Sequence, residues 1–180
     1  MRRLIRLILV SALAAGLLAS AGCKRKARKM TMEPADEETT SLATMVHVAD
    51  PRATVQLIRG FHDVEQNAWR WTMRKFSVTL KTPAGAAARG ATLQLKFVIP
   101  DVVLAKLKSL ALSASVEGTP LAGETYTAAG EQTYTRDVPP QAFKADAVTV
   151  DFVLDKALPP GPADRRELGV IVTTAGLEAR

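Results

Sequence analysis

The strongest constraint on the fold is a two-residue alternation of apolar and polar side chains that recurs in several short segments. In residues 91–99 (ATLQLKFVI) apolar side chains fill the odd positions, and Thr92, Gln94 and Lys96 alternate with them. Residues 110–117 and 147–154 repeat this period. Such alternation is typical of a β-strand with one face on the core and the other in water. Residues 167–177 are more apolar and predict a last, central strand.

Turn signals separate these segments at residues 117–120, 129–131, 139–140 and 159–162, and weaker strand candidates surround Tyr126 and Tyr134. Seven or eight short strands with little helix predict an all-β fold, an antiparallel β-sandwich of the jelly-roll or Ig-like kind. One or two short helical turns are expected, one of them at residues 101–108 after Pro100. No repeat of fixed period is visible, which argues against a propeller or solenoid.

The N-terminus has the order of charge, apolar core and small residues that is typical of a secretory signal peptide. Residues 1–22 begin with three arginines, continue through an apolar run at residues 7–18 and end in Ser20, Ala21 and Gly22. A retained membrane helix is the alternative, but the apolar run is short and glycines interrupt its end. We therefore expect residues 1–22 to be removed on export.

Cys23, the only cysteine, follows these small residues. It resembles the acceptor cysteine of bacterial lipoprotein signal peptides, although Ser20 stands where that family usually has Leu. The resemblance implies cleavage before Cys23 and attachment of acyl chains such as palmitate, which anchor the chain to a membrane of the bacterial cell envelope. A cut nearby that leaves a free thiol is the alternative. Lys24 resembles the pattern that permits sorting to the outer membrane in a cell with two membranes.

The positive charge of the chain is concentrated beside this cysteine. Residues 1–22 hold three of the 24 basic side chains, which leaves 21 against 18 acidic ones. Five of the 21 lie at residues 24–29, where they suit anionic lipid headgroups, and no nucleic-acid partner is expected. Residues 23–40 are polar throughout and predict a disordered charged tether after the lipidated cysteine.

The boundary between tether and domain is open. Residues 41–56 form an uncertain connecting segment, and residues 57–180 form the predicted β-sandwich domain. Asp50, Pro51 and Gly60 are typical of the start and end of a short helix. The apolar residues Val55, Leu57 and Ile58 fit a strand nearly as well.

No catalytic or metal-binding pattern stands out. The two histidines, His47 and His62, have no acidic or thiol partner at metal-ligand spacing, and no nucleophile turn or phosphate-binding glycine loop is present. We therefore predict no cofactor, no metal and no catalytic residues. A glycan-active enzyme would need two carboxylates about 5 to 10 Å apart in one cleft.

Two clusters of polar and aromatic residues remain: GFHDVEQNAWRWT at residues 60–72 and DRRELGV at residues 164–170. Here the chain resembles a group of bacterial envelope proteins that combine a Gly-aromatic-His turn, a Trp-Arg-Trp strand and a late Arg-Glu-Leu-Gly. The resemblance covers most of residues 57–178 and implies a β-sandwich domain more than an activity. Related sandwich domains appear beside enzymes of polysaccharide assembly.

Two interpretations of these clusters stay open. In the first, Arg70 or Arg166 pairs with Glu65 or Glu167 and braces a turn against neighbouring strands. In the second, exposed tryptophans offer an apolar surface to sugar rings while polar neighbours bind hydroxyl groups. The candidate ligand-binding residues are His62, Glu65, Trp69, Arg70, Trp71, Arg166 and Glu167.

The stretch WRWTMRKFSVTL, residues 69–80, bears on this choice because its alternation changes phase. Trp69, Trp71 and Met73 fall on odd positions, whereas residues 76, 78 and 80 carry the later apolar side chains. A bulge at Arg74 and Lys75 would turn both sets inward, and a straight strand would leave the tryptophans in water. Since burying unpaired arginines is costly, the sequence favours a bulge and buried tryptophans.

Together these features favour a lipid-anchored, non-enzymatic β-sandwich module that binds a glycan or an envelope protein. The alternatives are a structural or assembly lipoprotein without a small-ligand site and, less favoured, a glycan-active enzyme.

Overall fold

The computed structural model describes residues 41–180. The predicted signal peptide, the predicted lipidation site Cys23 and the predicted tether through residue 40 lie outside the described residues. Within residues 41–180, none of the helices has both the length and the apolar character that crossing a membrane requires.

The described chain is built mainly from nine strands, with two short α-helices and two 3₁₀ helices. The strands are β1 (Met45–His47), β2 (Leu57–Glu65), β3 (Trp69–Lys81), β4 (Ala91–Ile99), β5 (Leu110–Val116), β6 (Thr119–Tyr126), β7 (Gly130–Val138), β8 (Ala147–Leu154) and β9 (Ile171–Ala179). The helices are η1 (Pro51–Gln56), α1 (Ala86–Arg89), α2 (Asp101–Leu107) and η2 (Pro140–Ala142). The predicted turn after Pro100 is therefore confirmed as α2.

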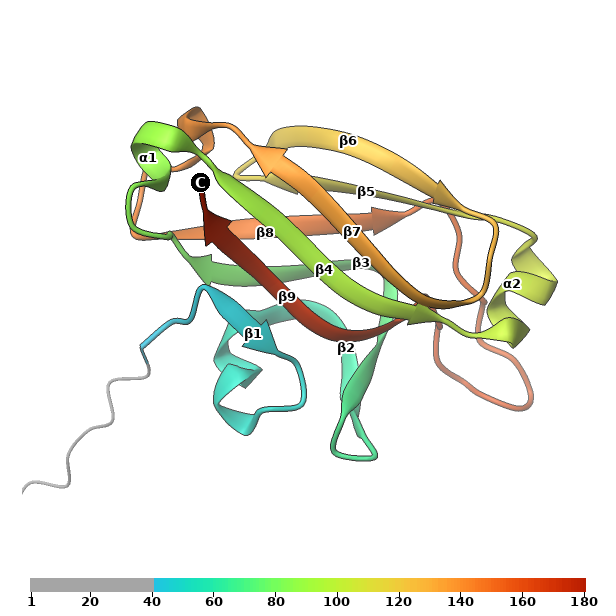
Figure 1. Ribbon diagram of the computed structural model, residues 1–180. Helices are drawn as coiled ribbons and strands as arrows, with labels where there is room; N and C mark the ends of the chain where they lie inside the picture. Colours follow the sequence, from blue (N-terminus) through green and yellow to red (C-terminus); the bar gives the residue numbers. More distant parts are fainter. Residues whose placement is uncertain (1–40) are drawn as a thin grey trace, which may run out of the picture. The chain divides into compact units, whose positions relative to one another are not determined.

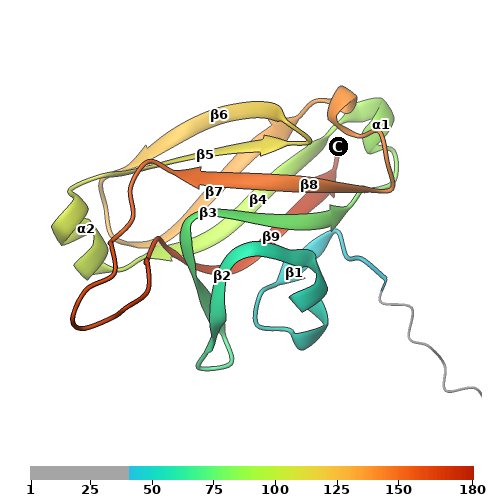
Figure 2. The same ribbon diagram turned by 180° about the vertical axis from the view of Figure 1, so that it is seen from behind.

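All strand pairs are antiparallel, and the hydrogen-bonded order is β6-β5-β8-β3-β9-β4-β7, with β2 added to β3 and β1 to β9. Figures 1 and 2 show two layers, with β6, β5, β8 and β3 in one and β7, β4 and β9 in the other. The predicted antiparallel β-sandwich is confirmed. Strand β3 belongs to both layers, since residues 75–81 pair with β8 whereas Arg70 and Trp71 pair with β9.

The core lies between the layers and is made by the alternating side chains. Strand β4 buries every odd residue from Ala91 to Ile99, and β8 buries every even residue from Val148 to Leu154. Phe76 of β3 stacks on Phe152 of β8 with ring centroids 5.0 Å apart. Each large side chain buried in this way contributes about 1.5 to 3 kcal/mol relative to leaving it exposed.

The chain between residues 41 and 60 takes both conformations that the sequence left open, one after the other. Asp50 accepts a hydrogen bond from the Arg52 amide and caps η1, which ends at Gln56. Strand β2 then begins at Leu57. Strand β1 adds to β9, so β9 lies inside its layer as predicted, although it begins at Ile171 rather than at Glu167.

Arginine side chains tie the two layers together at both open sides of the sandwich. On the side of β6 and β7, Arg136 donates to the carbonyls of Ala122 (2.8 Å) and Gly123 (3.1 Å) and pairs with Glu124 at 2.9 Å. On the other side, Arg70 donates to the carbonyls of Val48 (2.7 Å) and His62 (3.0 Å). Each of these arginines thus binds backbone carbonyl groups as well as belonging to a strand.

Candidate binding site

The candidate residues converge on the β2–β3 hairpin and on the loop that precedes β9. The last cross-strand pair of the hairpin is Glu65 with Trp69. Its turn holds Gln66 and Asn67 at positive φ (50° and 53°), a conformation that asparagine adopts more readily than most residues. Figure 1 shows the hairpin projecting from the lower end of the sandwich.

The phase change in the tryptophan segment marks a break in the pairing of β3. Arg59 pairs with Ser77, and Phe61 pairs with Thr72. Between these two pairs the chain advances by two residues in β2 but by five residues in β3. The irregularity falls at the predicted position, where β3 also leaves β9 for β8. Gly60 packs against it at φ +76°, and a Cβ there would lie 2.7 Å from the Cα of Phe76. Only glycine fits this position without strain.

The tryptophans are neither buried nor fully exposed. Trp71 is partly buried and packs against the core. Trp69 is also partly buried, and its indole nitrogen is enclosed without a hydrogen-bond acceptor among the described residues. The expectation that Met73 turns inward with them is wrong, because Met73 is 41% exposed. The break moves Met73 outward, while Thr72 takes the fully buried position.

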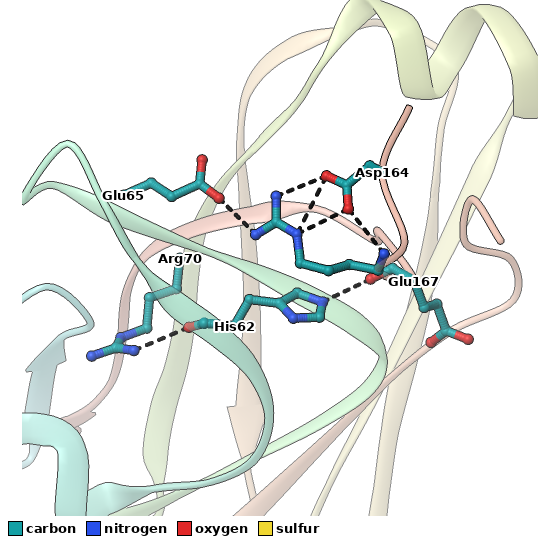
Figure 3. Close-up of polar contacts among 6 residues, drawn as sticks. His62, Glu65, Arg70, Asp164 and Glu167 are labelled. Carbon is teal, nitrogen blue, oxygen red and sulfur yellow. Dashed lines mark hydrogen bonds and ion pairs between the residues drawn. The ribbon is translucent and has the colours of Figure 1, made fainter. Parts of the chain in front are cut away.

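Arg166 is the centre of a polar cluster, and Figure 3 labels its two carboxylate partners, Glu65 and Asp164. Its Nη1 donates to Glu65 Oε1 at 2.7 Å, and its Nη2 donates to Asp164 Oδ2 at 2.8 Å. Of the arginine–carboxylate pairings that the sequence left open, the structure forms the one between Arg166 and Glu65. Hydrogen bonds from Arg166 lower the pKa of Asp164 to about 2, and the two carboxylates in turn raise the pKa of Arg166. The result is a charged bridge between the hairpin and the loop before β9.

Asp164 was not among the predicted site residues. Its side chain also accepts from the Arg166 amide at 2.9 Å, two residues along the chain. This local turn is common for aspartate, so the Asp-Arg-Arg sequence contained a signal for it.

The remaining candidates bind backbone groups instead of each other's side chains. His62 Nε2 lies 2.8 Å from the Glu167 carbonyl oxygen, and Glu167 Oε1 accepts from the Arg74 amide at 2.6 Å. Arg70, the other arginine considered for such a pair, instead donates from its guanidinium to two backbone carbonyls. The Arg70–His62 bond lies within the hairpin, whereas the other bonds join the hairpin to the loop before β9 or to Val48, as the bracing interpretation expects.

Gly169 lets the loop approach β3 closely. Its amide donates to the Thr72 carbonyl at 2.7 Å, and the Val170 amide donates to the Thr72 hydroxyl at 3.2 Å. A Cβ on Gly169 would lie 2.6 Å from Leu154 Cδ1 and 2.8 Å from Thr72 Oγ1. The Arg-Glu-Leu-Gly sequence therefore supplies Arg166, which forms the charged bridge, and Gly169, which lets the loop pack closely against Thr72.

The charged bridge still faces water over part of its surface. The side chains of Glu65, Arg166 and Asp164 are 37%, 36% and 34% exposed. Trp69 and Glu65 lie opposite each other across the hairpin, so their side chains stand on the same face. The structure thus brings an aromatic ring beside a fixed set of charged hydrogen-bonding groups.

Shallow hollows also lie elsewhere on the described surface. One is lined by residues of β5 and β6 and by Val153 and Asp155 at the end of β8, and another by residues of β6 and β7, among them Leu121 and Arg136. Among residues 41–180, no group of three or more His, Cys, Asp or Glu side chains could hold a metal ion.

No protein-family model matches the chain, and no curated protein matches it by sequence. Solved structures resemble it only in outline. The CBM36-1 domain of a multidomain xylanase from the hindgut metagenome of Trinervitermes trinervoides has 10% identity and a TM-score of 0.41, over 76% of this chain and 97% of that domain. The mannan-recognising carbohydrate-binding module TmCBM27 has 11% identity and a TM-score of 0.45, over 78% of this chain and 98% of the module.

A third similar structure is the acetyl xylan esterase Est2A from the rumen bacterium Butyrivibrio proteoclasticus. It has 8% identity and a TM-score of 0.43, over 76% of this chain and 32% of the esterase. At such low identities and TM-scores, none of these similarities bears on the function of this chain.

Proposed function

We propose that the chain is a lipid-anchored, non-catalytic module of the bacterial cell envelope that binds a glycan where the β2–β3 hairpin meets the loop before β9. The observation that carries this proposal is the position of Trp69. It lies across the hairpin from Glu65, and Glu65 is held by Arg166. An apolar ring beside fixed charged groups suits a sugar, which has apolar ring faces and hydroxyl edges.

The bridge prepares this surface for a ligand. Arg166 is held by two carboxylates, so neither it nor Glu65 has to lose much side-chain freedom when a ligand binds. Carboxylate oxygens can accept more than one hydrogen bond, and all three side chains remain about one third exposed. A sugar hydroxyl can therefore bind without breaking the bridge.

The same chemistry disfavours hydrolysis of the glycan. A glycosidase needs a carboxylic acid whose pKa is raised so that it can give up a proton to the leaving group. In this cluster the pKa of Asp164 is lowered to about 2, in the opposite direction. Glu65 is engaged by the same guanidinium. We therefore assign the cluster to binding.

The anchor is part of the proposal. Acylation of Cys23 would attach the domain to the envelope through residues 24–40, and Lys24 favours the outer membrane where two membranes exist. Mass spectrometry of the protein extracted from membranes tests this directly. An intact N-terminus or an unmodified cysteine would contradict the anchor, but it would leave the proposed glycan site unaffected.

Titration with cell-envelope polysaccharides, followed by tryptophan fluorescence, tests the binding site. Trp69 and Trp71 are the only tryptophans in the chain, so any spectral change reports on the hairpin. We expect a saturable shift with the mature lipoprotein in detergent. Absence of a shift with every polysaccharide of the native envelope would contradict a glycan site at the hairpin.

A structural or assembly lipoprotein is the second candidate, and the free edge of β2 favours it. Among the described residues, β2 pairs with β3 alone, and Val64 on this strand is 37% exposed. An unpaired edge can receive a strand from another protein. Crosslinking in cells from a photoreactive residue at position 64 would separate the two functions, because a glycan binder gives no specific protein adduct there.

A further inference from the structure

The point where the chain enters the domain is fixed against η1. Ala43 donates its amide to Gln56 Oε1 at 2.9 Å and accepts from Gln56 Nε2 at 3.0 Å. The Lys81 amide donates to the same Ala43 carbonyl at 3.0 Å. Gln56 is only 3% exposed, so this connection belongs to the body of the domain. The described chain therefore begins beside η1 and the end of β3.

Two large apolar side chains are exposed next to this connection. Val55 and Ile58 lie on either side of Gln56 and Leu57, and they are 58% and 54% exposed. They have the highest exposure among the large apolar residues of the described chain. Leu57, between Gln56 and Ile58, packs against the core, so the register of β2 directs the side chain of Ile58 away from it.

The charged groups around these side chains suit a phospholipid surface. Arg52 and Arg59 are 84% and 61% exposed and form ion pairs with Asp50 and Asp151. Lys81 is exposed beside Ala43. Arginine and lysine can lay their apolar stems along a membrane surface while their charged ends reach the headgroup phosphates.

We propose that η1 and the start of β2 form a membrane-contact surface, with Val55 and Ile58 entering the boundary between headgroups and acyl chains of a phospholipid bilayer. This inference rests on the proposed lipid anchor at Cys23. The predicted tether of about 17 residues has a root-mean-square reach of roughly 20 to 25 Å. Within that distance the tether keeps the local concentration of the bilayer high, so a small apolar contact is enough to orient the domain.

The contact would also set the position of the glycan site. Strand β2 leads from Leu57 at this surface to Glu65 at the hairpin turn. Figures 1 and 2 show η1 and the β2–β3 hairpin projecting from the same end of the sandwich. If η1 contacts the bilayer, the β2–β3 hairpin therefore also lies close to the bilayer, where membrane-attached glycans are linked to their lipids.

The test uses the lipidated full-length product on vesicles of phosphatidylethanolamine and phosphatidylglycerol. An environment-sensitive fluorophore is attached to Val55→Cys or, as matched control, to Val102→Cys in α2, where the native side chain is 52% exposed. An acylated Cys23 does not react with the fluorophore. We expect a blue-shifted emission and quenching by brominated lipids at position 55 and neither at position 102, and Ile58→Asp should reduce the quenching at position 55 at least twofold.

Equal emission and equal quenching at positions 55 and 102 would overturn the membrane-contact surface. Labelling of the parent chain, or failure of the parent chain to float with the vesicles, would instead overturn the anchor and this inference with it. A label at Ile58→Cys repeats the measurement should Val55→Cys fail to fold. The glycan site is tested separately by titration, so its failure is distinguishable from either result.

Discussion

Gly169 shows how closely the loop before β9 approaches the hairpin strand. A methyl group at this position would meet Leu154 Cδ1 at 2.6 Å and Thr72 Oγ1 at 2.8 Å, and both neighbours are fully buried. Neither side chain can move without disturbing the core. The close approach places Arg166 and Glu167 within reach of the hairpin.

Gly169→Ala should therefore destabilise the protein by about 1 to 3 kcal/mol, the usual cost of overpacking a filled core. The measurement is urea unfolding followed by circular dichroism. Gly161→Ala is the matched control, because a Cβ at Gly161 meets no atom within 4 Å. Equal midpoints for the two variants would show that the loop does not pack on Thr72 as described.

Asp164 should make the protein more sensitive to acid. Arg166 lowers its pKa in the folded state from 3.8 to about 2. A lowered pKa gives stability that is present above pH 4 and is lost as the pH falls towards 2. At pH 7, Asp164→Asn should therefore have a lower urea midpoint than the wild type. Near pH 2, the midpoints of the two proteins should be almost equal.

Asp63→Asn, an exposed position in the same hairpin, is the control for Asp164→Asn. It should not reproduce this pH-dependent difference. A constant gap between wild type and Asp164→Asn from pH 7 to pH 2 would contradict the assigned pKa.

Strand β3 is the element that joins the two layers, and its sequence predicts part of this role. The change from odd to even apolar positions correctly indicates an irregularity, which lies between Thr72 and Ser77 in the pairing of β3 with β2. The exposure of Met73 could not be derived in the same way, because it depends on the strands that flank β3. Those flanking strands, β8 and β9, come more than 60 residues later in the chain.

Arg70 of β3 supports the hairpin side of the sandwich through two backbone carbonyls. Arg70→Ala leaves the carbonyls of Val48 and His62 without their donor and should cost about 1 to 3 kcal/mol. Arg74→Ala on the same strand is the matched control, because Arg74 is exposed and binds Glu167 through its backbone amide alone among the bonds described. Urea unfolding compares them, and hydrogen exchange should show faster exchange in β1 for Arg70→Ala.

Equal stability of Arg70→Ala and Arg74→Ala would contradict the bracing role of Arg70. Faster hydrogen exchange of Arg70→Ala in β6 or β7, without any change in β1, would also contradict it, because Arg70 lies on the opposite side of the sandwich from β6 and β7.

For the molecule as a whole, the sequence predicts the strands better than their arrangement. Alternation in β4, β5 and β8 fixes which side chains face the core, so the sandwich could be expected. The order of the strands depends on contacts between distant segments, such as the pairing of Val78 with Val150. The alternation within a single strand does not indicate which distant strand it will pair with.

In the candidate site too, the local sequence predicts which residues take part, whereas their pairing depends on contacts between distant segments. The residues of the two clusters do come together, and Arg166 pairs with Glu65 across 101 positions of sequence. The sequence offered several arginine–carboxylate pairings and could not choose among them, because the choice depends on how Gly169 and Thr72 pack. The partial exposure of Trp69 likewise depends on this packing.

The glycan-binding proposal is tested by the affinity of the protein for bacterial cell-envelope polysaccharides, compared between two variants. Trp69→Ala removes the aromatic ring beside Glu65, and Val102→Ala removes an exposed apolar side chain on α2, away from the hairpin. The account predicts at least a tenfold loss of affinity, about 1.4 kcal/mol, for Trp69→Ala alone, with both variants still folded by circular dichroism. Unchanged affinity in a folded Trp69→Ala variant would contradict it.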